Sequence, residues 1–349
     1  MTKSDVNSPE KRQGYNSIDV FKFLMAFAVI AIHTGANLHT PNRDLKNALG
    51  IVLKMAVPFF FMSTGYILYP KIICEDVENA GDTLKNYLLK IIRMYVTWTL
   101  IYTPLEIYNN IKIGQPIFKA IALYIRSFLF VGSWYNSWHL WYLLATIYAI
   151  SVILLCKRKR LILVSLLGLI LMTFTDYIVG YRGEIAASIF LIKKLLYYTV
   201  SDGRIFKGLI YIPIGMCIGK ISDRKAKYRL VAAVALVAGF LLNMFIKSPI
   251  ISEYALIVSS VGFFYLVTDI NLKDSEIYRI LRKMSTTIYF IHMYVFTIIS
   301  LVLYSEIQRG LLMFLITSLI SLIIALALCY AGNSRSKGRD VIVQSLQDK

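Results

Sequence analysis

The chain has 349 residues, a formal net charge of +18 and 57% hydrophobic residues, with a mean hydropathy of +0.62. Soluble domains are usually about 45–50% apolar, so this composition excludes an ordinary soluble protein and favours a polytopic membrane protein. Its basic residues gather in short connections between apolar runs, which is a membrane topology signal, and no basic surface domain is left to bind nucleic acid.

Ten apolar segments predict an all-α fold of about ten transmembrane helices. The expected spans are 17–37, 49–69, 87–108, 138–156, 161–180, 205–220, 229–246, 254–270, 286–304 and 311–331. They divide the chain into a polar N-terminus, a membrane domain and a short tail, at residues 1–16, 17–331 and 332–349. The N-terminus lacks the pattern of a cleaved signal peptide, so we expect the first span to be retained.

Lys and Arg set the expected orientation. They are concentrated in alternate connections, and the KRKR run at 157–160 is the clearest anchor. This asymmetry predicts that both termini lie in the cytoplasm. Four cysteines, Cys74, Cys156, Cys217 and Cys329, fall at or near that side, so we expect reduced thiols that serve packing or surface roles.

Three connections are long enough to carry structure of their own. Residues 70–86 are polar and acidic, and we expect a cytoplasmic loop there. Residues 109–137 and 181–204 lie on the outer side and place lysine or arginine inside apolar runs. This pattern predicts interfacial or re-entrant helices in both segments. Either they form walls or a lid over an outward cavity, or they simply lie on the membrane surface.

The first span carries the best candidate for chemistry. Lys22 and His33 are eleven residues apart, which is almost three helical turns, so they share one face about 16 Å apart along the axis. His33 lies in the outer half and is the candidate general base. Lys22 and Asp19 lie near the cytoplasmic surface, either as an interfacial charge pair or as a site for an anionic group such as a phosphate.

Two further histidines fall in or at the edge of spans, where ionisable groups usually face a cavity or a partner. His139 lies between Trp138 and Trp141 in the sequence, at the outer start of the fourth span, and His292 follows Tyr289 in the ninth. The alternatives are hydrogen-bonded packing histidines and an interfacial aromatic belt. His39, in an outer loop, is expected to be an ordinary surface residue.

The second span contains the run VPFFFMSTGYILYP. Pro58 and Gly65 can bend or thin a membrane helix, and Ser63 can satisfy backbone groups that the bend frees. The segment is therefore either a kinked packing helix or a kink that shapes a cavity, with Ser63 as a lining residue.

Soluble-enzyme motifs are absent from the sequence: there is no GxSxG, P-loop or HExxH, and no cysteine–histidine spacing typical of a metal site. No carboxylate pair lies in mid-span, as a proton-coupled pump would require. What remains is a histidine-centred site with access from two sides, where a cytoplasmic activated donor meets an outward acceptor.

Four blocks, in order, resemble the membrane acyltransferase-3 family: IDVFKFLMAFAVIAIHT, VPFFFMSTGYIL, WHLWYL and IYFIHMYV. The basic start of the third span, LLKIIRMYV, is also similar, and the likeness covers about residues 15–331. Members of this family transfer acyl groups, mostly acetyl, to sugars and envelope glycans.

The resemblance implies that His33 is the catalytic histidine and that Lys22 takes the position of the family's arginine. Lysine keeps the charge but lacks the planar bidentate fork of arginine. The acidic residues that often follow the tryptophan block are also missing here, because WYLLATIYAI has none. Acetyl-CoA would be the donor substrate, with no permanently bound cofactor and no metal.

The same blocks are also similar to the membrane half of vancomycin-resistance serine racemases, where that domain is associated with serine uptake. We expect this chain to carry no racemase domain. Two alternatives to an enzyme stay open: a small-molecule or serine-type transporter, and a non-catalytic membrane partner of envelope synthesis. The lack of broken-helix repeats favours the enzyme over the transporter.

The resemblance further implies a multi-pass protein of the bacterial plasma membrane that contacts membrane lipid and modifies a glycan or a lipid-linked glycan. Envelope-biosynthesis proteins would be its possible partners. The sequence does not indicate the acceptor, the acyl chain length or the oligomeric state.

Overall fold

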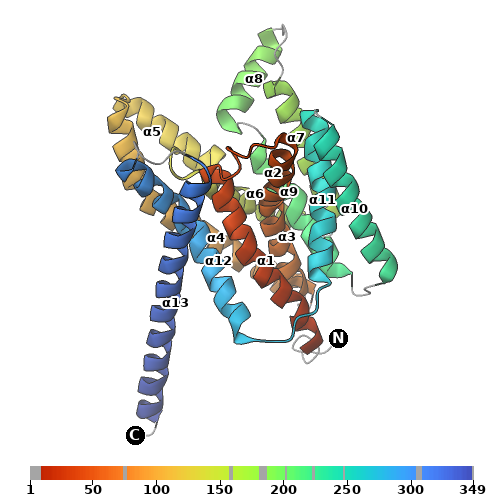
Figure 1. Cartoon of the computed structure of the whole chain (residues 1–349), viewed down its shortest axis with the longest axis vertical. Helices are drawn as coiled ribbons and strands as arrows, with labels where there is room; N and C mark the ends of the chain where they lie inside the picture. The colour runs from red at the N-terminus through yellow and green to blue at the C-terminus, as the bar shows by residue number, and fades with distance from the viewer. Residues whose placement is uncertain are drawn as a thin grey trace. The chain divides into compact units, whose positions relative to one another are not determined.

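The computed structural model describes residues 9–73, 77–156, 160–180, 187–200, 203–221, 225–246, 248–303 and 309–347 (Figure 1). Its regular elements in this part of the chain are all helices, which confirms the all-α prediction. The chain forms two compact units. The first comprises residues 1–12 and 57–270, and the second comprises residues 13–56 and 271–349.

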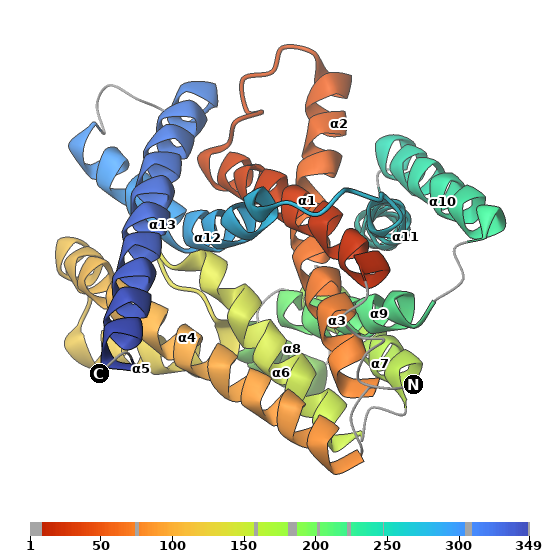
Figure 2. The ribbon, with the colours of Figure 1, turned by 90° about the horizontal axis from the view of Figure 1, so that it is seen from below.

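The first unit contains nine α-helices and three short helical turns within the described residues. They are α3 (Ala56–Ile73), α4 (Val77–Lys112), α5 (Ile117–Arg126), η2 (Ser127–Val131), η3 (Trp138–Leu140), α6 (Trp141–Leu155), α7 (Leu161–Gly180), α8 (Ala187–Thr199), η4 (Arg204–Phe206), α9 (Lys207–Lys220), α10 (Ala226–Phe245) and α11 (Pro249–Thr268). Helices α10 and α11 pack along their lengths, and α9 packs on α6 and α7 (Figures 1 and 2).

Aromatic side chains of α3 form much of the core of this unit. The Phe59 ring meets Phe264 of α11 at 5.2 Å, and the Phe61 ring meets Tyr142 of α6 at 4.4 Å. Both phenylalanines are fully buried. The run of apolar residues in the second predicted span therefore packs on two sides, as expected for a helix inside a bundle.

The second unit consists of α1 (Pro9–Thr34), α2 (Arg43–Lys54), α12 (Glu276–Val302) and α13 (Leu311–Gln347), as far as it is described. Asn42 caps α2, because its side-chain oxygen accepts from the amides of Asp44 and Leu45. Helix α12 packs against α13, and α1 lies beside α12 in both views (Figures 1 and 2).

Eight stretches within the described residues are long and apolar enough to cross a membrane. They are Tyr15–Thr34, Arg43–Ile72, Trp138–Leu155, Leu161–Gly180, Ala226–Phe245, Pro249–Thr268, Glu276–Val302 and Leu311–Ala331, and each matches a predicted span. The other two predicted spans fall on α4, which is 36 residues long and carries several charges, and on α9, which has 14 residues. The count of ten and the location of the termini stay predictions.

The predicted loop at 70–86 is wrong for most of its length. Helix α3 continues to Ile73 and α4 begins at Val77, so only residues 74–76 lie outside the described part. The segment is polar, but it contains good helix formers such as glutamate, lysine and leucine. The polar residues of this segment make it unsuitable for a lipid-facing span, but they do not prevent it from forming a helix. Similarly, α13 continues through the predicted tail as far as Gln347.

Both amphipathic segments, 109–137 and 181–204, contain helices, α5 and α8, whose described side chains are largely exposed. They also touch: Arg126 Nε donates a hydrogen bond to the carbonyl oxygen of Tyr198 at 2.5 Å, and the guanidinium lies over the Tyr198 ring. Whether they form a wall or lie on a membrane surface stays a prediction.

Some sequence features lie outside the described residues. These are Cys74 and parts of the 157–160, 181–204, 1–16 and 332–349 segments. Cys156, Cys217 and Cys329 are free thiols.

Candidate functional site

Helices α1 and α12 run parallel within the second unit. Asp19 near the start of α1 binds Arg282 of α12, and His33 near the end of α1 meets His292 further along α12. Residue numbers rise in the same direction along both helices from the first contact to the second, so the two helices are parallel. The predicted topology requires this of the first and ninth spans. This shared side, with a charged group at one end and a histidine pair at the other, is here called the α1–α12 face.

Asp19 and Arg282 form a bidentate ion pair at the charged end. Arg282 Nε lies 2.9 and 3.0 Å from the two carboxylate oxygens of Asp19, and one terminal nitrogen lies 2.5 Å from Oδ2. The Asp19 side chain is 1% exposed, whereas that of Arg282 is 52% exposed. Both oxygens of the Asp19 carboxylate thus accept hydrogen bonds from Arg282. The guanidinium keeps a solvent-facing side with further N–H donors.

Lys22 lies one helical turn after Asp19 and interacts electrostatically with both members of this pair. Two basic side chains therefore face the Asp19 carboxylate at this end of the α1–α12 face, and a second carboxylate, that of Asp274, accepts from the Asn16 amide nitrogen at 3.4 Å. Asn16 also belongs here, because its amide nitrogen donates to the carbonyl of Leu272 at 3.4 Å and so ties α1 to the segment before α12.

His33 occupies the last turn of α1 because the helix stops directly after it. Gly35 has a left-handed φ of 68°, and the Ala36 amide donates back to the Ala31 carbonyl at 3.0 Å. This is the glycine-dependent end that commonly terminates helices. The predicted span continued to residue 37, so its end was three residues too late. The imidazole consequently lies at a helix C-terminus and is half-buried.

The rings of His33 and His292 lie 5.4 Å apart between centroids, tilted by 38°. His292 is fully buried, and its Nδ1 lies 3.2 Å from the carbonyl oxygen of Ile288. A carbonyl can only accept, so this bond places the proton on Nδ1 and leaves Nε2 as the basic nitrogen of the neutral ring. The Tyr289 ring lies 6.0 Å from that of His292. The structure thus brings three of the predicted site residues together.

The other predicted site residues lie in the first unit. Ser63 is buried in α3, with its hydroxyl donating to the Phe59 carbonyl at 2.7 Å. Trp138 is exposed, whereas His139 is buried with its ring 5.1 Å from that of Tyr102. The Trp141 ring meets Phe61 at 5.9 Å. These contacts are those of a packed aromatic core.

Arg282 is the residue that sequence reasoning missed. It pairs with Asp19 across 263 positions of sequence, and no local pattern reveals that contact. One signal was present: Arg282 precedes His292 by ten residues, much as Lys22 precedes His33 by eleven. A basic residue about three turns before a histidine therefore occurs on both helices of the face. Among the described residues, no group of three or more potential metal ligands gathers at this face or elsewhere.

His39 is exposed, as expected, and its Nε2 lies 2.9 Å from the carbonyl oxygen of Arg309. It therefore helps to hold the loop after α1 near the start of α13. It takes no part in the α1–α12 face.

An all-helical chain whose described part contains eight stretches long and apolar enough to cross a membrane has the architecture of a multi-pass membrane protein. A family model described as an acyltransferase domain matches residues 15–332. The chain therefore belongs to the acyltransferase-3 family.

Curated relatives carry a different name. Two proteins called amino-acid racemase from Enterococcus faecalis are 30% and 31% identical over 223 and 227 residues. A serine/alanine racemase from Enterococcus gallinarum is 27% identical over 226 residues. Each alignment covers 61–63% of this chain and 30% of the relative, so the chain matches less than a third of these proteins. No solved structure matches.

Proposed function

We propose that the protein is a membrane O-acyltransferase, most simply an O-acetyltransferase, which moves an acyl group from cytoplasmic acyl-CoA to a hydroxyl of a surface glycan or a lipid-linked precursor. The observation that carries the proposal is the His33–His292 pair on the same α1–α12 face as the cationic group of Lys22 and Arg282. Membership of an acyltransferase family supports it.

The charged end suits the anionic part of an acyl-CoA. Phosphates bind best to charge-assisted N–H donors, and a guanidinium supplies them in a fixed planar fork. Lysine at position 22 lacks that fork, but Arg282 adds one from α12. In this proposal Asp19 is a positioning residue: it holds Arg282 and does not touch the donor.

The histidine end suits the reacting centre. His33 takes the proton of the acceptor hydroxyl while the oxygen attacks the thioester carbonyl. The new C–O bond forms, the C–S bond breaks, and the departing thiolate recovers the proton from His33. His292 stays neutral during this step, because two imidazolium rings about 5 Å apart would repel one another.

Lys22 and His33 are separated by about 16 Å along α1. An elongated donor can span that separation with its phosphates at one end and its thioester at the other. The proposal also includes ten spans, with both termini in the cytoplasm of a bacterium and the chain in its plasma membrane, so that the donor enters from inside and the acceptor from outside.

The test is a transfer assay with acetyl-labelled acetyl-CoA in membranes that contain the whole chain and a glycan fraction. We expect label in the glycan with the native protein and with His39→Ala, and none with His33→Ala at equal insertion. The proposal is wrong if His33→Ala transfers label normally. It is also wrong if the native protein transfers none and instead takes up labelled serine without acetyl-CoA.

A further inference from the structure

A fixed cation lies at the histidine end of the α1–α12 face. Arg309 comes just before α13, and its guanidinium carbon lies 5.6 Å from the centre of the Phe296 ring. This separation is within the range of a cation–π contact. Phe296 follows His292 by four residues on α12, so both side chains lie on one side of that helix. Arg309 therefore belongs to the same face as the histidine pair, about one helical turn further along α12.

The segment that carries Arg309 is bound to the end of α1. The Gly310 amide donates to the carbonyl of Thr34 at 3.0 Å, and Thr34 directly follows His33. The side chain of Arg309 starts close to the same turn, because a Cβ added at Gly35 would lie 3.8 Å from the Cβ of Arg309. Two contacts with α1 and one with α12 thus place this arginine next to the turn that ends the helix of His33.

The stacking contact leaves the edge of the guanidinium for other partners. A guanidinium stacks through its planar face, whereas its five N–H donors lie in the plane and point outward from its edge. Arg309 is exposed, and the Phe296 ring beneath it is 8% exposed. The ring is therefore a buried support for an exposed guanidinium. In this arrangement the arginine can offer two parallel N–H groups to a phosphate or a carboxylate.

Preordering makes Arg309 a better anion site than an ordinary surface arginine. Exposed ion pairs contribute little in water, partly because two long side chains must be held in one geometry. Arg309 is already held by its contact with Phe296 and by the Gly310–Thr34 bond. Less conformational freedom is therefore lost when an anion binds. Lys46 is less suited to this role, because its ammonium donates to the Leu38 carbonyl at 2.9 Å.

The position of Arg309 decides which substrate it meets. In the proposed reaction the phosphates of the acyl-CoA lie with Lys22 and Arg282 at the charged end, and Lys22 is about 16 Å from His33 along α1. The thioester of the acyl-CoA, which reaches His33, is uncharged. An anionic group beside Arg309 therefore comes from the other substrate, the acyl acceptor.

We infer that Arg309 is a specificity-determining residue that binds a phosphate or carboxylate group of the acyl acceptor. The acceptor is then an anionic molecule whose charged group is offset by about one helical turn, roughly 6 Å, from the hydroxyl that is acylated. A neutral acceptor offers the guanidinium no such partner. The assignment to the acceptor rests on the proposed function, whereas the binding of an anion at Arg309 does not.

Protection from phenylglyoxal, a reagent that modifies arginine, tests binding at this one side chain. The native full chain is placed in phosphatidylcholine nanodiscs, and the rate of modification at each arginine is followed by peptide mass spectrometry. Saturating glucose 6-phosphate or glucuronate should slow the modification of Arg309 about fivefold or more. Methyl glucoside, the neutral counterpart, should leave the rate unchanged. Because no residue is replaced, a folding defect cannot produce the result.

Arg43 is the matched control within the same experiment. It is an exposed arginine at the start of α2, and none of the three ligands should change its rate of modification. Equal protection of Arg43 and Arg309 would reveal a general effect of anions and would overturn the inference. Protection of Arg309 by methyl glucoside, or by no anion at all, would overturn it too.

Nanodiscs that also contain phosphatidylglycerol separate a lipid headgroup from a soluble acceptor. If this lipid alone protects Arg309 and the two sugar anions add nothing, the arginine binds the membrane and its assignment to the acceptor is wrong. Protection by the sugar anions in both kinds of disc supports the assignment.

Acyl transfer provides the second test. Arg309→Ala should raise the KM for an anionic acceptor about tenfold, while kcat and the KM for a neutral acceptor change by less than about twofold. Arg309→Lys keeps the charge but loses the planar fork, so its KM should lie between the two. A purely structural role at the start of α13 would instead affect both acceptors alike. Arg43→Ala should behave like the native chain.

Failure of the inference differs from failure of the proposed function. If Arg309 is protected but the native chain transfers no acyl group to any acceptor, the proposed function is wrong and the anion site remains. If transfer proceeds equally well to neutral and anionic acceptors and Arg309 is unprotected, the proposed function remains and the inference is wrong.

Discussion

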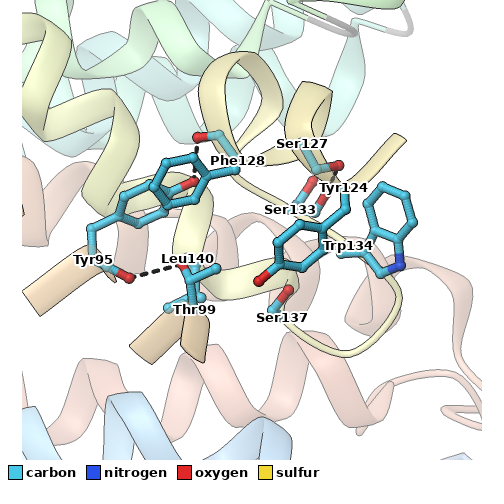
Figure 3. A pocket seen from close by; sticks show the side chains of 10 residues that line it. Tyr95, Thr99, Tyr124, Ser127, Phe128, Ser133, Trp134, Ser137 and Leu140 are labelled. Atoms are coloured by element: carbon cyan, nitrogen blue, oxygen red, sulfur yellow. Dashed lines mark hydrogen bonds between the residues drawn. The ribbon is translucent and has the colours of Figure 1, made fainter. Parts of the chain in front are cut away.

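The α1–α12 face differs from a small pocket that lies between α4 and the segment from α5 to η3 and is here called the α4 pocket (Figure 3). The face concentrates charge: Asp19 and Arg282 form a bidentate pair, Lys22 adds a second cation, and two histidines follow. The pocket has no charged lining residue, and its hydroxyl protons are held by the protein. The two regions lie in separate units of the chain, so a change in one can serve as a control for a change in the other.

The largest effect that separates the two regions is expected at His292. Asn can keep the bond to the Ile288 carbonyl but supplies no second ring nitrogen, so His292→Asn should fold and lower the transfer rate about a hundredfold or more. Thermal stability should be nearly unchanged. The rate is measured with labelled acetyl-CoA and the stability by thermal unfolding in detergent. A normal rate in this variant would reduce His292 to a packing residue.

A substitution at Gly132, which lines the α4 pocket, should act on stability instead. A Cβ there would lie 2.6 Å from the Trp141 backbone, and the φ of 70° is unfavourable for alanine, so Gly132→Ala should lower stability by about 2–4 kcal/mol. Gly114 has a φ of 64° with open space around it, so Gly114→Ala isolates the backbone strain and should lower stability by only about 1 kcal/mol. Thermal unfolding in detergent compares the two. Equal losses would show that the close contact at Gly132 is unimportant.

Arg282 tests the donor end of the face. Arg282→Ala should raise the KM for acetyl-CoA about tenfold, a value reduced for the half-exposed position of this side chain. It also leaves the buried Asp19 without its bidentate partner, which destabilises the unit. The matched control is Arg279→Ala, one turn earlier on α12, whose partner Glu276 is exposed.

A double variant separates these two effects of Arg282. Asp19→Asn with Arg282→Gln removes the unpaired buried charge and should recover stability, but the KM should stay high. If the double variant restores the KM as well as the stability, Arg282 acts only in folding.

The sequence predicted the parts of the α1–α12 face that lie on one helix. Lys22 and His33 share a side because helical spacing is fixed, and an apolar run of this length has few alternatives to a helix in a membrane. Arg282 could not be predicted in the same way, because its pairing with Asp19 depends on which helices become neighbours.

The α4 pocket shows the same limit more strongly. Glu106 of α4 is buried, and nothing local in the sequence indicates that its carboxylate accepts hydrogen bonds from Asn136 and Ser137. The segment 109–137 was predicted to be helical from its periodicity. Its π-helical turn was not, because one extra residue in a turn leaves the pattern of apolar residues almost unchanged.

Mass spectrometry of surface glycans tests the central claim most directly. Glycans are compared from cells that lack the protein, cells that express it, and cells that express His33→Ala at an equal membrane level. The account predicts acetylated glycan only with the native chain, and glycan masses in the His33→Ala cells that match those of cells lacking the protein. Identical acetylation in cells with the native chain and cells with His33→Ala would contradict it.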